Sequence, residues 1–223
     1  WDQFVEFWRS IRPEYIESGG EGLAVLSEAF NSPTLHSLKQ EFARQYPKAT
    51  WVVYEPVSDE NISQGIKIAT GKSLLPRYNF DKAAVILSLD SDFLNLETDS
   101  VVNSRKFMDS RRLKSERDSM NRLYCVESSF TLTGAIADHR LRMKSSLIGS
   151  LTYALAQELK RSGLKITLPG GLGMTTTGSY SEKWLRITAQ DLLKNRGKSL
   201  VVAGRRQPAS VHVLTTLINE ALG

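Results

Sequence analysis

The sequence predicts an α/β fold: a doubly wound, Rossmann-like parallel sheet of about five strands with helices on both faces. Apolar runs and segments of helical period alternate along the whole chain. One run, residues 83–89, is apolar without alternation, which is typical of a parallel strand buried on both faces. No clear linker interrupts the 223 residues, so we expect a single domain spanning 1–223.

The expected elements follow one another in βα order after a first helix at 2–11. Ser32 followed by Pro33 is typical of a helix start, and Gly71 of a helix end. We expect mutually parallel strands near 22–27, 50–54, 83–89, 122–126 and 199–203. We expect further helices near 33–46, 59–70, 100–113, 146–161, 181–195 and 208–222, an irregular stretch at 127–144, and a flexible loop or insertion at 163–181.

Composition excludes several classes of protein. Hydrophobic residues make up 41% and charged residues 24%, as in globular domains. A single cysteine excludes a disulfide framework, a zinc ribbon and a cysteine-ligated iron–sulfur cluster within this chain. No run of 18 apolar residues is present, so we expect no membrane span. The chain starts at Trp1 rather than Met, so we expect a processed product or an excerpt of a longer protein.

Short glycine motifs do not meet the requirements of phosphate-binding loops. Gly71–Ser73 and Gly197–Ser199 resemble the end of a P-loop, but Ile66 and Leu192 stand where its first glycine is needed. Gly170–Gly173 lacks the third glycine of a dinucleotide fingerprint and is better explained as a surface loop.

Histidines and basic residues give weak signals. His36 and His212 fall on expected helices, where a surface position is the simplest interpretation, and a relay of His139 with Asp138 or Asp90 stays open. The basic stretch 105–122 contains one aromatic residue, so it is typical of a solvated helix face or a protein-docking surface rather than a nucleic-acid patch.

Acidic residues gather where the expected strands end. Because parallel strands end at one edge of a sheet, these residues would line its ligand crevice. The crevice candidates are Ser27, Glu55, Asp90, Ser91, Asp92, Glu127, Ser128, Asp138, Arg140 and Arg205. Clustered carboxylates need neutralisation, so we expect them to pair with arginines (Arg140, and Arg205 or Arg206) across the crevice mouth. An open acidic pocket for a cation or a basic partner is the alternative. In the segment 131–140, which joins a strand to a helix, we expect contacts between Asp138 and Arg140 to hold an ordered crossover.

The chain resembles the molybdopterin oxidoreductase superfamily over most of its length, in the α/β region that holds the pterin dinucleotide. The strand-and-helix segments that carry the resemblance are "AVLSEAFNSPTLHSLKQEFAR" (24–44), "DKAAVILSLDSDFLN" (81–95), "RLYCVESSFTLTGAIADHRLRM" (122–143) and "GKSLVVAGRRQPASVHVLTTLINEALG" (197–223).

Within that superfamily, "SPTLHSL", "TLTGAIADHR" and "VVAGRRQPASVHVL" look most like the iron–sulfur subunit of bacterial alternative complex III, a quinol-oxidising membrane complex. The resemblance implies a cofactor-free domain, with iron–sulfur clusters elsewhere in the parent polypeptide. Its partners would be other subunits of the complex on the periplasmic side of the inner membrane. Its function would be structural, as a protein-interaction domain without catalytic or metal-binding residues of its own.

Two departures from active relatives favour the cofactor-free branch. Asp90–Asp92 stands where they have Gly-Ser-Asn, and like charges about 4 Å apart cost roughly 4 kcal/mol at an effective dielectric near 20. Glu127-Ser128 replaces their Asp-Pro-Arg turn, and Cys125 falls mid-strand, where we expect it buried and unligated. The alternative is a molybdopterin- or nucleotide-binding domain of an active oxidoreductase, in which the acids accept ribose hydroxyls.

Overall fold

The structure, a computed structural model, describes residues 1–170 and 180–223. Contacts divide the chain into two compact units, 1–58 and 59–223, and each is described by itself. The expected α/β class is confirmed, since both units contain helices and a parallel sheet. The expected loop at 163–181, with most of the 170–173 turn, falls largely on residues 171–179 and so lies outside the described residues.

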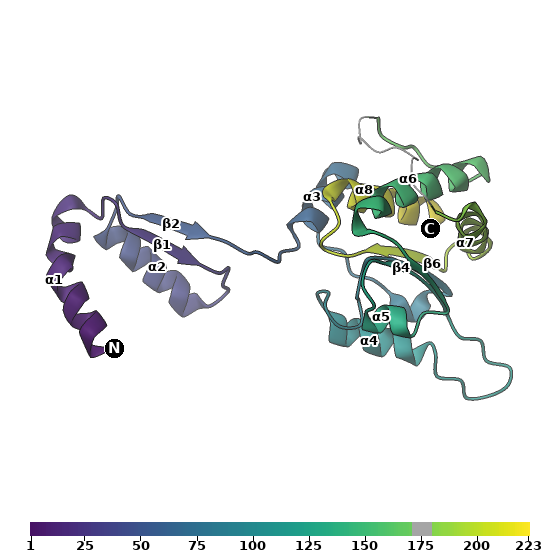
Figure 1. Cartoon of the computed structure of the whole chain (residues 1–223), viewed down its shortest axis with the longest axis horizontal. Helices are drawn as coiled ribbons and strands as arrows, with labels where there is room; N and C mark the ends of the chain where they lie inside the picture. The colour runs from purple at the N-terminus through teal and green to yellow at the C-terminus, as the bar shows by residue number, and fades with distance from the viewer. Residues whose placement is uncertain (171–179) are drawn as a thin grey trace. The chain divides into compact units, whose positions relative to one another are not determined.

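The first unit consists of two helices and two strands (Figure 1). The elements are α1 (Asp2–Ser18), β1 (Ala24–Ser27), α2 (Pro33–Gln45) and β2 (Thr50–Val53), and the two strands pair in parallel. Ser32 caps α2 as expected, because its side chain accepts a hydrogen bond from the Leu35 N–H. The rings of Phe42 and Trp51 lie 5.4 Å apart and join α2 to β2.

The five expected strands lie in two sheets rather than one, which corrects the single five-stranded sheet. The strands expected at 22–27 and 50–54 pair only with each other among the described strands. The other three form a second sheet with a strand that we did not expect. Local sequence pattern reports that a segment is a strand but not which strand it joins, so the separation was not visible in the sequence.

The second unit holds the larger sheet. Its elements are α3 (Glu60–Thr70), the 3₁₀ turn η1 (Phe80–Lys82), β3 (Val85–Leu89), α4 (Ser100–Asp109), β4 (Arg122–Glu127), α5 (Leu132–Ala135), β5 (His139–Arg142), α6 (Ser145–Arg161), α7 (Glu182–Lys194), β6 (Ser199–Ala203) and α8 (Ala209–Leu222).

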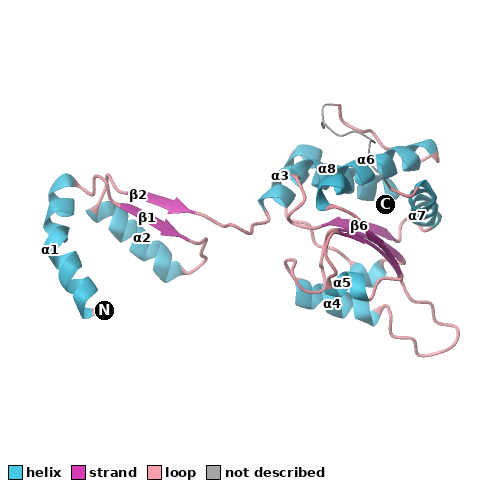
Figure 2. Ribbon diagram, in the orientation of Figure 1, coloured by secondary structure: helices cyan, strands magenta, loops and turns pink. Residues whose placement is uncertain are grey.

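All four strands of this sheet are parallel, in the order β5-β4-β3-β6. Helices α6, α7 and α8 pack on one face through one hydrophobic core, and α4 and η1 pack on the other through a second core (Figure 2). The central strand β3 is buried at every residue, which explains its unbroken apolar sequence. This is a doubly wound sheet with helices on both faces, as expected.

Strand β5 falls in the stretch 127–144 that we expected to be irregular. Its sequence, His139-Arg-Leu-Arg142, is mostly polar because β5 is an edge strand with largely exposed side chains. Cys125, in the middle of β4, is buried as expected.

Candidate functional site

The order of strands reverses between β3 and β6. From β3 the chain proceeds outward through β4 to β5, and then adds β6 on the other side of β3. In open α/β sheets, ligands bind beyond the carboxyl ends of the strands at such a reversal. The turn after β3 and the turn after β6 therefore form the expected ligand position of this sheet.

Asp90 joins four segments at this edge. One carboxylate oxygen, Oδ1, accepts hydrogen bonds from the backbone N–H of Ser128 (3.2 Å) and from its hydroxyl (3.3 Å). The other, Oδ2, accepts from the hydroxyl of Ser145 (2.6 Å) and from Nε2 of Gln207 (2.9 Å). Asp90 has a φ of 54°, a left-handed conformation that Asp tolerates better than most residues. Its side chain thus ties together the ends of β3 and β4, the start of α6 and the loop before α8.

Gly204 and Arg205 bring the β6 turn directly against the β3 turn. A Cβ on Gly204 would overlap the carbonyl oxygen of Asp90, so only glycine permits this approach. Oε2 of Glu97 accepts hydrogen bonds from the backbone N–H of Arg205 (3.1 Å) and from its Nε (3.3 Å). The same guanidinium donates through Nη2 to the carbonyl of Leu96 at 2.7 Å. The two turns that would enclose a ligand are therefore bonded to each other.

Glu127 is buried, with 2% of its side chain exposed, and is paired with Arg140 at 2.5 Å. The hydroxyl of Thr131 donates to its other oxygen at 2.6 Å. Gly134 lies directly over the carboxylate, and a Cβ there would collide with it. The expected pairing of Glu127 with Arg140 is confirmed.

The other two acids of the crevice have partners different from those expected. Asp90 is bonded to neutral side chains, as described above, and Asp92 accepts two hydrogen bonds from Thr133. Arg205, which we expected opposite these acids, pairs instead with Glu97 and with Asp59. The reason is that the turn after β3 continues through residues 93–99 and presents Glu97 to the β6 turn.

Asp138 lies at the opposite end of the strands. It precedes β5 and accepts a hydrogen bond from the Leu123 N–H at the start of β4 (2.8 Å). Arg111 pairs with it through two nitrogens (2.6 and 3.0 Å), which corrects the expected Asp138–Arg140 contact. Burial alone would raise the pKa of Asp138, but the bonds from Arg111 and from Leu123 outweigh it and lower the pKa.

Ser27 and Glu55 belong to the separate two-stranded sheet. Ser27 ends β1, and its hydroxyl accepts a hydrogen bond from Nε1 of Trp51 (2.9 Å). Glu55 follows β2 and accepts from the Ala29 N–H (2.8 Å). They hold the ends of β1 and β2 together and take no part in the larger sheet's edge.

A hollow of about 320 Å³ remains on the α4 side of the edge. Its lining includes Ser91, Tyr78 and three acids, Asp59, Glu97 and Asp99, beside Arg77 and Lys106. Burial raises the pKa of Glu97, against the effect of hydrogen bonds and charge from Arg205. Burial also raises the pKa of Tyr78, and the nearby carboxylates raise it further.

A molybdopterin dinucleotide does not fit these residues. Its pyrophosphate needs a close approach to open backbone N–H groups at the first turn, as in dinucleotide sites. Here the turn after β3 carries the Asp90 carboxylate, and Gly204 in the turn after β6 packs on the backbone of Asp90. Glu97, which is bonded to Arg205, adds a further acid. We therefore derive no chemistry that passes through such a cofactor.

Histidines and metal-ligating groups form no reactive cluster in the described residues. His139 stacks on Tyr124, with ring centroids 4.6 Å apart, and Asp138 is bonded to Arg111 and Leu123, so these contacts do not join the two residues in a Ser–His–Asp relay. No group of three or more potential metal ligands occurs within residues 1–170 and 180–223. Over the same residues, no helix is long and apolar enough to span a membrane.

The basic stretch 105–122 is largely paired. Four of its seven basic side chains, Lys106, Arg111, Arg112 and Arg122, have an acidic partner within 4.0 Å. Arg111 and Arg122 reach acids on distant segments, Asp138 and Asp191. This arrangement suits a structural role better than the binding of phosphates.

The sequence did not identify Glu97, Ser145 or Gln207 as residues of interest. It placed His212 at a helix surface, which is wrong, because His212 is buried with 2% exposed. Ser145 and Gln207 are polar residues in turns next to a strand end or a helix start, which is a usable signal. Glu97 lies seven residues beyond Asp90 with no motif around it. Only the fold brings it to Arg205, which is 108 residues away in sequence.

Neither family models nor curated proteins give a match to this chain.

Proposed function

We propose that this chain is a cofactor-free, Rossmann-like domain that serves as a structural and protein-interaction element of a respiratory quinol-oxidising complex. The resemblance to the iron–sulfur subunit of alternative complex III supports the type of complex. The bonded turns at the carboxyl edge support the loss of a cofactor.

The observation that carries the proposal is the direct bonding between the β3 and β6 turns. Gly204 packs on the Asp90 carbonyl, Gln207 donates to the Asp90 carboxylate, and Arg205 is bonded to Glu97 and Leu96. These contacts use the chain's own groups at the place where a dinucleotide-binding sheet keeps space for its ligand. A scaffold gains stability from such contacts, whereas a binding site would have to break them.

Exposed apolar side chains support contact with other proteins. Leu75, Leu96 and Val101 are 68%, 59% and 83% exposed, and all three belong to segments around the carboxyl edge. Exposed apolar groups of this kind suit a surface that another subunit covers.

The rest of the proposal follows from the resemblance. The partners are other subunits or domains of a bacterial membrane complex, on the periplasmic side of the inner membrane. The iron–sulfur clusters belong to other parts of the parent polypeptide, and neither nucleic acid nor molybdenum is a ligand of this chain.

Purification of the tagged parent protein from bacterial membranes tests this proposal. We expect it to co-purify with other respiratory subunits, to contain no stoichiometric molybdenum or pterin, and to form lysine cross-links from this domain to those subunits. Stoichiometric molybdenum or pterin would support the alternative of an active oxidoreductase domain. Recovery of the parent protein alone, without other subunits, would contradict the interaction role.

A further inference from the structure

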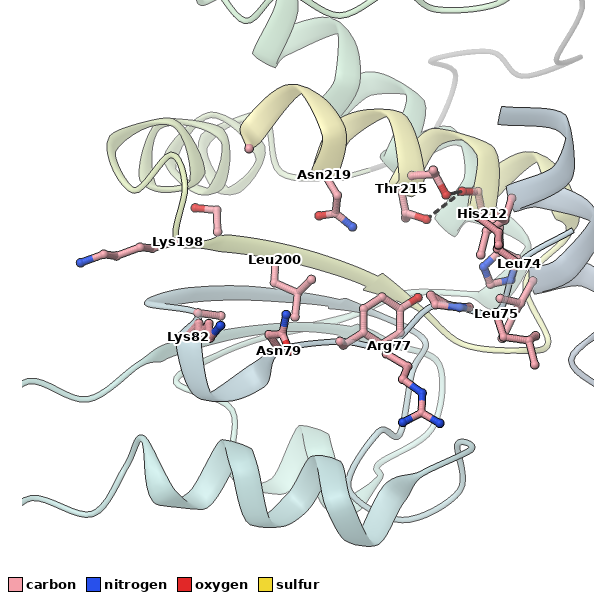
Figure 3. Close-up of a pocket in the computed structure, with 18 of the residues that line it drawn as sticks. Leu74, Leu75, Arg77, Asn79, Lys82, Lys198, Leu200, His212, Thr215 and Asn219 are labelled. Carbon is pink, nitrogen blue, oxygen red and sulfur yellow. Dashed lines mark hydrogen bonds between the residues drawn. The ribbon is translucent and has the colours of Figure 1, made fainter. Parts of the chain in front are cut away.

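A second cavity, of about 470 Å³, lies beside the open edge of β6 and shares Ile62, Leu75 and Tyr78 with the lining of the first hollow. It is bounded by α3, the segment 74–79, the amino-terminal half of β6 and the inner side of α8 (Figure 3). Its volume is in the range of small-molecule sites in proteins.

Part of the wall of this cavity is aliphatic. Ile62 and Ile66 come from α3, Leu74 and Leu75 from the segment that follows it, and Leu200 from β6. Helix α3 packs closely on α8 because Gly65 meets His212 and Ala209, and a Cβ on Gly65 would overlap both. This close crossing forms one end of the cavity. An apolar molecule would therefore find contacts along its length.

His212 places an unpartnered polar atom among these walls. The residue is 2% exposed, and its Nε2 has no hydrogen-bond partner in the described structure. Figure 3 shows its ring on the side of α8 toward Leu74 and Leu75. A buried polar atom without a partner carries a free-energy cost, which a ligand could remove by bonding to it.

The bonding of His212 shows what kind of partner Nε2 lacks. Burial lowers the pKa of His212 to about 4, and its hydrogen bonds to the backbone at Gln207 and Gly204 oppose that effect only in part. The ring is therefore neutral at neutral pH. Because the backbone at Gln207 and Gly204 favours a ring N–H and Nε2 has no partner, we infer that the proton lies on Nδ1 and that Nε2 presents a lone pair. The missing partner is a hydrogen-bond donor.

Neighbouring polar groups offer acceptors as well. The hydroxyls of Thr215 and Thr216 donate to the carbonyl of His212, at 3.1 and 2.7 Å, so only their oxygen lone pairs remain available. The amide of Asn219 is bonded to both backbone groups of Val201. Nε2 of His212 and these hydroxyl lone pairs can each accept a hydrogen bond from a bound molecule.

The mouth of the cavity is positively charged. Its lining includes Arg77, Lys82 and Lys198 and, among the described residues, no Asp or Glu side chain. Figure 3 shows Lys198 extending outward, so we assign to it attraction at the entrance rather than direct contact, whereas Arg77 extends toward the α4 side, where it also lines the first hollow. Such a field favours an anionic molecule over a cationic one.

We propose that this cavity binds a small organic anion with an apolar body and a hydroxyl or N–H group that donates to Nε2 of His212. The apolar body lies against α3 and Leu200, and the anionic group faces the basic entrance. The site is separate from the proposed function of the chain and does not depend on it.

Titration of the isotope-labelled chain with 3-(4-hydroxyphenyl)propionate, followed by NMR, tests the proposal. We expect saturable shifts in residues of α3, β6 and α8. The methoxy analogue lacks the donor and should bind roughly tenfold more weakly, as the loss of one buried hydrogen bond implies. Equal binding of the two compounds, shifts confined to other regions, or no saturable shift at millimolar ligand would overturn the proposal.

Two variants and a control identify the site. His212→Phe keeps a ring of similar size and should weaken binding of the hydroxy compound to the level of the methoxy analogue. The Lys82→Gln/Lys198→Gln double variant changes only exposed side chains, so it stays informative if His212→Phe does not fold. It should weaken binding and reduce its salt dependence.

Lys183→Gln, on α7, is the matched control and should bind as the unmodified chain does. Unchanged binding in the lysine double variant would contradict the charged entrance, and unchanged binding in folded His212→Phe would contradict the site itself.

Discussion

The carboxyl edge of the four-stranded sheet and the cavity beside β6 differ in how their ionisable side chains are bonded. At the carboxyl edge, Asp90 has several partners from distant segments, and Glu127 is bonded to Thr131 and Arg140. In the cavity, Nε2 of His212 has none in the described structure. The usual ligand position of this fold holds bonded carboxylates, and Oε1 of Gln207 there lacks a hydrogen-bond partner, as Nε2 of His212 does in the cavity. On the proposed assignment, the ligand lies away from the position that fold class alone would give.

Free energy explains why the difference matters. Bonds to a carboxylate at the carboxyl edge must be broken before a ligand can enter, at a cost of about 1–3 kcal/mol for each group left unsatisfied. At His212 a donor relieves an existing cost. The following experiments test the two sides of this comparison, in order of decreasing expected effect.

The largest effect is expected for Arg140→Met. The substitution leaves the carboxylate of Glu127 buried without its ionic partner, which typically costs about 3–5 kcal/mol. Urea denaturation measures the free energy of unfolding. Arg142→Met, at an exposed position of the same strand, is the control and should change it by less than about 0.5 kcal/mol. A loss below about 1 kcal/mol for Arg140→Met would mean that the pair does not hold this edge.

The second effect concerns pH and His212. The folded pKa of about 4 lies below the ordinary value of 6.5, so the unfolded chain binds more protons between these values. Stability should therefore fall as pH decreases from 6.5 to about 4, by up to about 3 kcal/mol. Glu97, whose pKa is raised in the folded chain, acts in the opposite direction. Its contribution to the stability of the folded chain increases as the pH falls toward the ordinary pKa of a glutamate side chain.

Comparison with His212→Phe separates these contributions. The difference in unfolding free energy between the unmodified chain and this variant should change with pH between 6.5 and 4. The contribution of Glu97 cancels in this difference, because Glu97 is present in both. His36→Phe, an exposed position on α2, should retain the slope. A pH dependence that is the same in His212→Phe would show that His212 is not the titrating group.

The third effect tests the joining role of Asp90. Asp90→Ala removes the acceptor for Ser128, Ser145 and Gln207 and places alanine at a left-handed φ, so we expect a loss of about 2 kcal/mol. Asp90→Asn keeps a residue that tolerates this conformation and should lose less. Thermal and urea unfolding measure both. Equal losses in the two variants would assign the effect to charge alone.

The smallest effect is expected at the open edge of β6. The amide of Asn219 bonds the N–H and the carbonyl of Val201, in place of a neighbouring strand. Asn219→Ala should cost about 1 kcal/mol, since water can replace part of these bonds, and should increase self-association at the freed edge. Glu220→Ala, the next residue on α8 and exposed, is the control. Gel filtration that shows no change for Asn219→Ala would argue against the protective role.

The sequence predicted which segments form strands of the larger sheet better than it predicted how the strands pair. Strands β3, β4 and β6 were found because apolar runs mark strands buried on both faces. Strand β5 was missed because an edge strand needs no apolar run, and its arginines serve other roles, as Arg140 does for Glu127. The separation of β1 and β2 was missed because pairing depends on contacts between distant segments.

For the candidate site, the position of a residue relative to a strand end predicted whether it lies at the carboxyl edge. The sequence did not predict which side chains bond to one another there. Asp90, Asp92 and Glu127 were correctly placed at the carboxyl edge, since parallel strands must end together. Asp138 was misplaced because its strand, β5, was not recognised. The roles of Glu97 and His212 depend on burial and on contacts between residues far apart in sequence, which no local pattern reports.

Calorimetric titration with NAD⁺ and with inorganic pyrophosphate tests the central claim most directly. The account predicts no saturable binding of either compound at millimolar concentration, because the β3 and β6 turns are bonded to each other and carry carboxylates. Saturable binding at micromolar concentration, with shifts at Asp90, Gly204 and Arg205 in a parallel NMR titration, would show that the carboxyl edge opens to a phosphate ligand and would contradict the account.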